Sequence, residues 1–137
     1  AHMRSTLAIL TAILAGCTPP HYSRLTGSWV SDLQATVSHN RSIAPQMDWQ
    51  KYSQLFGRMR VTYDDKGVAT ELNGVVERSP LHVVRRDADT VTLKIHDRLD
   101  KEDRLLVVHF VGPEMYWIHI RDTEHREYFH RVRQSEK

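Results

Sequence analysis

The sequence has few of the residues that define several protein classes. A single cysteine among 137 residues excludes an intramolecular disulfide framework and a zinc site built from several cysteines. Glycine and proline number only 6 and 5, and hydrophobic residues make up 40%, which excludes a disordered, collagen-like or low-complexity protein. The formal net charge of +2 is too small to indicate a nucleic-acid binder. This length predicts one globular domain.

Signatures of catalysis are missing as well. The chain has no Gly-x-Ser-x-Gly elbow, no glycine-rich phosphate loop and no His-Glu-x-x-His motif. The acidic pairs Asp64-Asp65 and Asp87/Asp89 fall where hairpin turns are expected, and Asp side chains in turns bond to their own backbone. We therefore predict a protein that is not an enzyme and that uses no cofactor and no metal.

The longest apolar run lies at the N-terminus. Residues 1–2 are typical of a cloning scar ahead of Met3, Arg4 adds one positive charge, and residues 6–14 are apolar apart from two threonines. This run is shorter than the ~20 residues that a transmembrane helix needs. A basic start, an apolar middle and small residues at the end are typical of a secretory signal peptide, so residues 1–16 are expected to lie outside the fold.

Leu14-Ala15-Gly16-Cys17 closes this segment and resembles the lipobox of bacterial lipoproteins. In that family the cysteine sulfur receives a diacylglyceryl group, a peptidase cuts before the cysteine, and the new amine is usually acylated, as with palmitate. The resemblance implies lipidation at Cys17 and an anchor in a lipid bilayer. Thr18 follows instead of the aspartate that retains lipoproteins in the inner membrane, which implies an outer-membrane lipoprotein facing the periplasm.

The alternative is that residues 3–16 form a core helix and that Cys17 is a buried thiol. Thr18-Pro19-Pro20 argues against it, because consecutive prolines break a helix at once, as a tether would. The expected organisation is a signal segment at 1–16, a lipidated tether at 17–24, a β-domain at 25–133 and a C-terminal tail at 134–137.

Beyond the tether, apolar and polar residues alternate with the period of two that is typical of half-buried strands. Turn residues separate the runs, as in Asp64-Asp65-Lys66-Gly67 and Asn73-Gly74. Short turns predict an antiparallel up-and-down meander, and such a sheet tends to curl into a small barrel because closure removes edge strands. The fold class is therefore mainly β, with about eight strands expected at 25–31, 59–63, 68–72, 81–85, 91–95, 105–111, 115–120 and 126–132.

A helical insertion is expected after the first strand. Asp32 can cap a short helix over 33–38 by accepting backbone N–H bonds. Apolar residues at helical spacing predict a second helix over 42–56, and Gly57 suits the position just past its end. We expect these helices to cover one mouth of the barrel.

Gly27-Ser28-Trp29 opens the first strand and is similar to the Gly-x-Trp opening of lipocalins and the wider calycin group. In those folds the Trp closes the bottom of the barrel and an Arg from a late strand stacks on it. The resemblance implies a lipocalin-like barrel in which Trp29 has that place and Arg131 stacks on it by a cation–π contact.

Aromatic residues gather in the last two expected strands, at Tyr116, Trp117, Tyr128 and Phe129. Residues on one face of these strands would line an apolar cavity, as in calycins that bind small apolar molecules. Alternatively, they fill a small barrel, because eight strands enclose just enough room for side chains, and this filled core is the reading we favour. The candidate ligand-binding residues are Trp29, Tyr116, Trp117, Tyr128 and Arg131.

Of nine histidines, four lie in the last three expected strands: His109, His119, His125 and His130. Three converging imidazoles would bind zinc or copper. No His-x-His pair occurs, so we expect these side chains to be partly exposed on strand faces instead.

These observations favour a membrane-anchored periplasmic lipoprotein that serves as a non-catalytic binding or accessory module for an apolar ligand or an envelope partner. The alternative is an inhibitor or immunity-type protein that binds a periplasmic enzyme or toxin, with the charged loop at 97–103 as its wedge. An enzyme is a third class, for which the sequence offers no constellation.

Overall fold

The computed structural model describes residues 24–97 and 101–133. The predicted signal peptide, the lipobox ending at Cys17, the tether up to residue 23 and the tail at 134–137 lie outside the described residues. Within the described part of the chain, no helix combines the length and the apolar composition needed to cross a bilayer.

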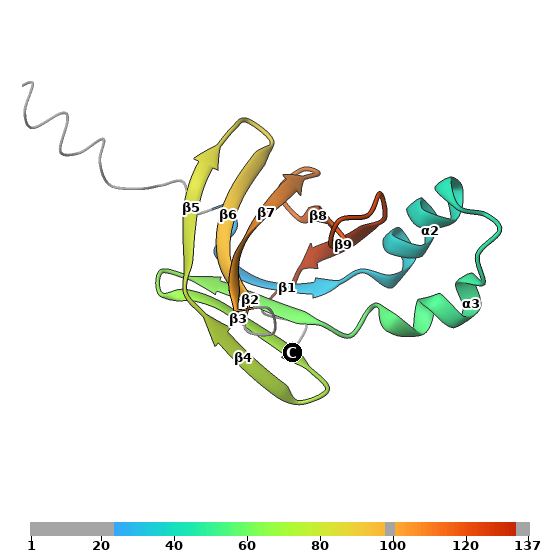
Figure 1. Cartoon of the computed structure of the whole chain (residues 1–137), viewed down its shortest axis with the longest axis horizontal. Coiled ribbons are helices and arrows are strands. Elements are labelled where there is room, and N and C mark those ends of the chain that lie inside the picture. Colours follow the sequence, from blue (N-terminus) through green and yellow to red (C-terminus); the bar gives the residue numbers. More distant parts are fainter. Residues whose placement is uncertain (1–23, 98–100, 134–137) are drawn as a thin grey trace, which may run out of the picture.

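The molecule is mainly β, with nine antiparallel strands in one nearly closed, barrel-like sheet (Figure 1). The strands are β1 Gly27–Ser31, β2 Arg60–Asp64, β3 Gly67–Leu72, β4 Val75–Ser79, β5 Leu81–Arg86, β6 Thr90–Asp97, β7 Glu102–Phe110, β8 Met115–His119 and β9 Arg126–Arg131. Their order in the sheet is β4-β3-β2-β1-β9-β8-β7-β6-β5. The first and last strands pair with each other, so the two ends of the described sheet-forming chain lie side by side in the middle of the sheet.

The edges of the sheet are β4 and β5, although they follow each other in the chain. Figure 1 shows them diverging from the turn that joins them. The predicted antiparallel meander is confirmed, but β4 is a ninth strand that the sequence did not indicate. Four of its five residues are exposed, so its side chains carry no alternation of buried and exposed positions.

Two of the predicted turns form as their chemistry dictates. The Asp64 carboxylate accepts hydrogen bonds from the backbone N–H groups of Lys66 (2.8 Å) and Gly67 (3.0 Å) between β2 and β3. Asn73 and Gly74 both adopt positive φ, of 53° and 82°, between β3 and β4. That pair of conformations matches the right-handed twist of the flanking strands, and Asn and Gly are the residues that adopt it most readily.

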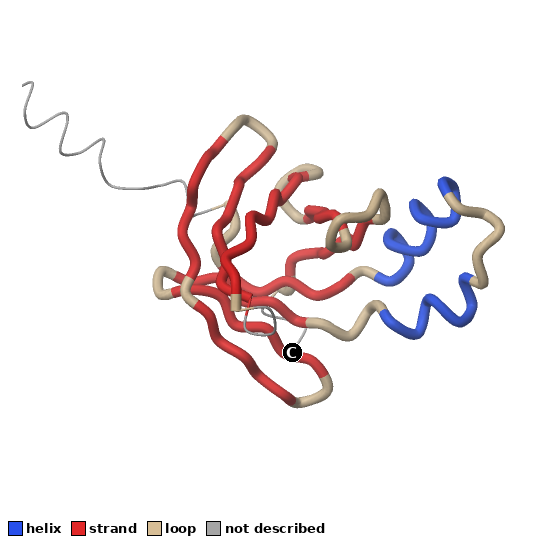
Figure 2. The backbone as a smooth tube through the Cα atoms, in the orientation of Figure 1, coloured by secondary structure: helices blue, strands red, loops and turns tan. Residues whose placement is uncertain are grey.

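The helical insertion after β1 is present as α2 (Leu33–Ile43), the single turn α3 (Trp49–Tyr52) and a 3-10 turn at Ser53–Leu55, shown in blue in Figure 2. Asp32 caps α2 by accepting from the N–H of Ala35 at 2.9 Å, as predicted. The predicted lengths were wrong, since the first helix runs beyond residue 38 and the second does not start at residue 42. The second begins at Trp49, because Asp48 caps it through the N–H of Lys51.

The polar side of α2 joins it to the sheet. β1 ends at Ser31, and from there α2 takes its place beside β9. The Asn40 amide donates to the carbonyl of Arg126 (2.8 Å) and accepts from its N–H (2.9 Å), as a neighbouring strand would. The Thr36 hydroxyl accepts from the N–H of Tyr128 at 2.9 Å. Both side chains are buried, so backbone groups that would otherwise be unpaired are satisfied.

The interior is packed most densely around Trp29, which is fully buried. Its indole N–H donates to the carbonyl of Leu25 at 2.8 Å, and its ring meets the Tyr116 ring edge-on at 4.7 Å. The Arg131 guanidinium lies over the indole at 4.3 Å. The predicted contact between Trp29 and Arg131 is therefore present, and we refer to this region as the packed end of the interior.

Candidate functional site

Two pockets that open to solvent lie beside this packed core. They form a larger and a smaller lobe of about 660 and 400 Å³, within the range of small-molecule sites. They share four apolar side chains from four strand regions: Met59, Ile95, Leu106 and Ile118. This lining differs from the packed end of the interior, because these positions carry aliphatic side chains and methionine in place of large rings.

The floor of the smaller lobe is aromatic. Tyr63, Tyr116 and Phe129 line it, and the hydroxyls of the two tyrosines are 3.0 Å apart. Burial and the neighbouring Tyr63 raise the pKa of Tyr116 well above its ordinary value, so this hydroxyl stays neutral. A neutral pair that satisfies its own hydrogen bonds presents a largely apolar surface to a ligand.

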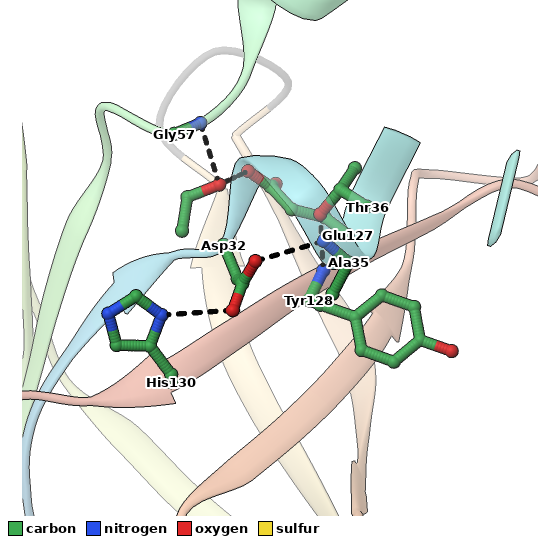
Figure 3. Close-up of polar contacts among 8 residues, drawn as sticks. Asp32, Ala35, Thr36, Gly57, Glu127, Tyr128 and His130 are labelled. Atoms are coloured by element: carbon green, nitrogen blue, oxygen red, sulfur yellow. Dashed lines mark hydrogen bonds and ion pairs between the residues drawn. The ribbon is translucent and has the colours of Figure 1, made fainter. Parts of the chain in front are cut away.

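The larger lobe contains a carboxyl group that the sequence did not single out. Glu127 of β9 lines it beside Ile118, its cross-strand partner on β8. The Ser31 hydroxyl donates to the Glu127 carboxylate at 2.7 Å and accepts from the Gly57 N–H at 3.0 Å (Figure 3). Ser31 is buried, so this chain of bonds fixes the carboxyl between β1, β9 and the end of the helical insertion.

Gly57 is required for this arrangement. Its φ is +86°, and a Cβ at this position would come within 3.0 Å of the Leu33 Cβ. A side chain here would therefore displace α2 or the N–H that reaches Ser31. Gly57 was expected only as a helix terminator, but it also positions a donor in the polar chain that holds Glu127.

Burial raises the pKa of Glu127 above its ordinary value, and the hydrogen bond from Ser31 opposes that effect. The carboxyl thus ionises less readily than a surface glutamate, and an opposite charge in the lobe would favour its ionised form. Charged and polar side chains line the mouth around it. These are Arg104, His119, Arg121 and Asp122, of which the last three are exposed.

The five sequence-predicted ligand residues do not form one site. Trp29 and Arg131 lie at the packed end, and Tyr116 contacts Trp29 and also lines the smaller lobe. Trp117 and Tyr128 point to the outer face of the sheet, because each directly neighbours an inward residue in its strand. Their rings are 6.5 Å apart there.

Trp117 is the centre of a stack on that outer face. The His109 ring lies parallel to it at 3.8 Å, and the Arg126 guanidinium lies over it at 3.6 Å. His119 meets the indole edge-on at 5.1 Å. Burial lowers the pKa of His109, with His119 and Arg126 adding to the effect, so this imidazole is neutral over most of the physiological range.

The remaining two histidines of the predicted group lie elsewhere. His125 packs edge-on against Trp49 of α3 at 6.1 Å, and His130 approaches the Asp32 carboxylate at 3.1 Å (Figure 3). The four imidazoles therefore do not converge on one point. Among the described residues no group of three or more His, Cys, Asp and Glu side chains is arranged to hold a metal ion.

The charged loop expected at 97–103 is shorter than predicted. Asp97 ends β6, and Glu102 and Asp103 begin β7, while residues 98–100 lie outside the described residues. Asp103 is tied to the sheet by Lys94 at 3.5 Å and His96 at 3.2 Å. Lys94 and His96 thus pair with one of the acidic side chains that belonged to the expected wedge.

The arrangement as a whole is an open, mostly apolar pocket with one half-buried carboxyl, a lining suited to holding a small amphiphilic molecule. Comparison of the chain with protein-family models, with curated proteins and with solved structures gives no match.

Proposed function

We propose that this protein is a membrane-anchored periplasmic lipoprotein that binds a small, mainly apolar ligand inside its barrel without catalysing a reaction. The observation that carries the binding function is the cavity between Met59, Ile95, Leu106 and Ile118. Burying apolar ligand surface against these aliphatic walls contributes about 25 cal/mol per Å² to binding.

Binding can be tested with the neutral fluorescent probe N-phenyl-1-naphthylamine on the full chain carrying Cys17→Ser. The variants Leu106→Trp and Ile118→Trp fill positions shared by both lobes and should abolish the fluorescence gain. Val84→Trp is the matched control, because Val84 is 56% exposed on the edge strand β5. Thermal unfolding of each variant checks that it folds. Equal probe binding by the filled and control variants would refute the cavity as the site.

Support for the anchor comes from the lipobox at 14–17 and the prolines that follow it. One acyl chain gives marginal membrane binding and two or more give stable binding, so a lipidated Cys17 would hold the domain firmly. Expressed with its signal in a Gram-negative host, the wild-type protein should sediment with outer membranes. Cys17→Ser should leave it uncut or release it. Identical fractionation of the two proteins would refute the lipid anchor.

A further inference from the structure

The Glu127 carboxyl is anchored through one of its two oxygens. Its Oε2 accepts from Ser31, whereas its Oε1 accepts from no described residue and is accessible to water. A carboxylate has about four acceptor positions, so most of its capacity is directed into the lobe that it lines. A side chain that served only to support β1 would not need to face a cavity.

We infer that the ligand is an amphiphile with a protonated amine head, which docks against Glu127 while its apolar part extends past Ile118 and Leu106 toward the aromatic floor. This inference rests on the cavity being the binding site, as proposed above. An ammonium donates hydrogen bonds to the Oε1 oxygen and places an opposite charge beside the half-buried carboxylate.

The position of Glu127 favours a cation over an anion. Charges interact more strongly at a half-buried position than at a solvated rim, because water and salt screen the latter. Arg121 is exposed at the mouth, and Asp122 beside it supplies the opposite charge. Arg104 is half-buried and already has an interaction of its own. An anionic head would have to approach Glu127 against direct repulsion.

The test compares octylamine, octanol and octanoate, which share one chain length and differ in the head. Calorimetry on the full chain carrying Cys17→Ser should show octylamine binding at least about tenfold more tightly than the other two, as expected for a charge-assisted bond. In Glu127→Gln this preference should disappear while octanol binding stays unchanged, because the amide oxygen can still accept from Ser31. Retained octanol binding also shows that the variant is folded.

Asp122→Asn is the matched control, since it removes one carboxylate from the exposed rim of the same lobe. It should leave the octylamine preference within about twofold, as is usual for screened surface charges. Octanoate binding as tightly as octylamine, or a preference that survives Glu127→Gln, would overturn the inference but leave the cavity intact. Failure of all three ligands to bind would instead refute the binding function itself.

Discussion

Arg131 lies over Trp29 at the packed end of the interior, and the contribution of each residue to the free energy of unfolding can be measured. Trp29→Ala should lower the free energy of unfolding by about 3–5 kcal/mol, since it removes a fully buried ring and leaves a cavity. It also leaves the Leu25 carbonyl without its indole donor. This would place Trp29 among the most damaging single substitutions in the chain.

Arg131→Met removes the charge and keeps much of the stem. The guanidinium donates to the carbonyls of Arg24 at 2.7 Å and Thr26 at 2.8 Å, and the side chain is 25% exposed. Bonds to a charged group each contribute about 1.5–3 kcal/mol, and partial exposure reduces that. We therefore expect a loss of about 2–3 kcal/mol for Arg131→Met, with a change below about 0.5 kcal/mol for the exposed loop control Arg121→Met.

The stacking itself is isolated by a double-mutant cycle. If the cation–π contact at 4.3 Å stabilises the fold, the double variant should lose less than the two single losses added together, by about 0.5–2 kcal/mol. Urea unfolding followed by circular dichroism gives the four free energies. Losses that add within about 0.3 kcal/mol would show that Arg131 acts through its carbonyl bonds and its ion pair with Glu114, and would refute the stacking argument.

Three further predictions concern other parts of the fold. Because burial raises the pKa of the Glu127 carboxyl, the native state binds a proton there more tightly than the unfolded state does. Wild-type stability should therefore fall as the pH rises from the pKa of Glu127 in the unfolded state to its pKa in the folded state. Glu127→Gln should remove this loss in Tm measurements from pH ~4 to ~8. Asn40→Ala should destabilise by about 2–4 kcal/mol in urea because two backbone groups of β9 lose their partner, whereas Ser38→Ala on the exposed side of α2 should change little. Gly67→Ala should lower Tm more than Gly74→Ala, since a Cβ at Gly67 would lie 2.3 Å from a backbone oxygen while none lies within 4 Å at Gly74; equal losses would contradict the steric argument.

Local chemistry made most of the fold readable from the sequence. Turns at Asp64 and Asn73 are determined by residues that satisfy their own backbone or tolerate positive φ. β4 was missed because an exposed edge strand needs no alternating pattern. The length of α2 was missed because it depends on Asn40 reaching the backbone of β9, a contact 86 residues away along the chain. Such long-range pairing produces no periodic pattern in the sequence.

The candidate site was harder to predict than the fold. Trp29 and Arg131 could be paired through a resemblance, and the structure brings them together. Glu127 was overlooked because a charged residue in a strand is normally assigned to the solvent face. Its signal was its spacing, two residues before the buried Phe129 on the same strand, which places both on the inner face.

The direction of β1 connects the anchor to the cavity. The strand starts at the packed end, where the Leu25 carbonyl binds Trp29, and it finishes at Ser31, which holds Glu127 in the larger lobe. The seven residues from Thr18 to Arg24 would join a lipid on Cys17 to the packed end, and they span at most about 25 Å. The proposed anchor would therefore attach on the side of the packed end, and a tether of this length would leave the domain free to turn relative to the bilayer. Lengthening the tether should leave uptake of a soluble probe unchanged, whereas a faster uptake with a longer tether would show that the bilayer obstructs the mouth.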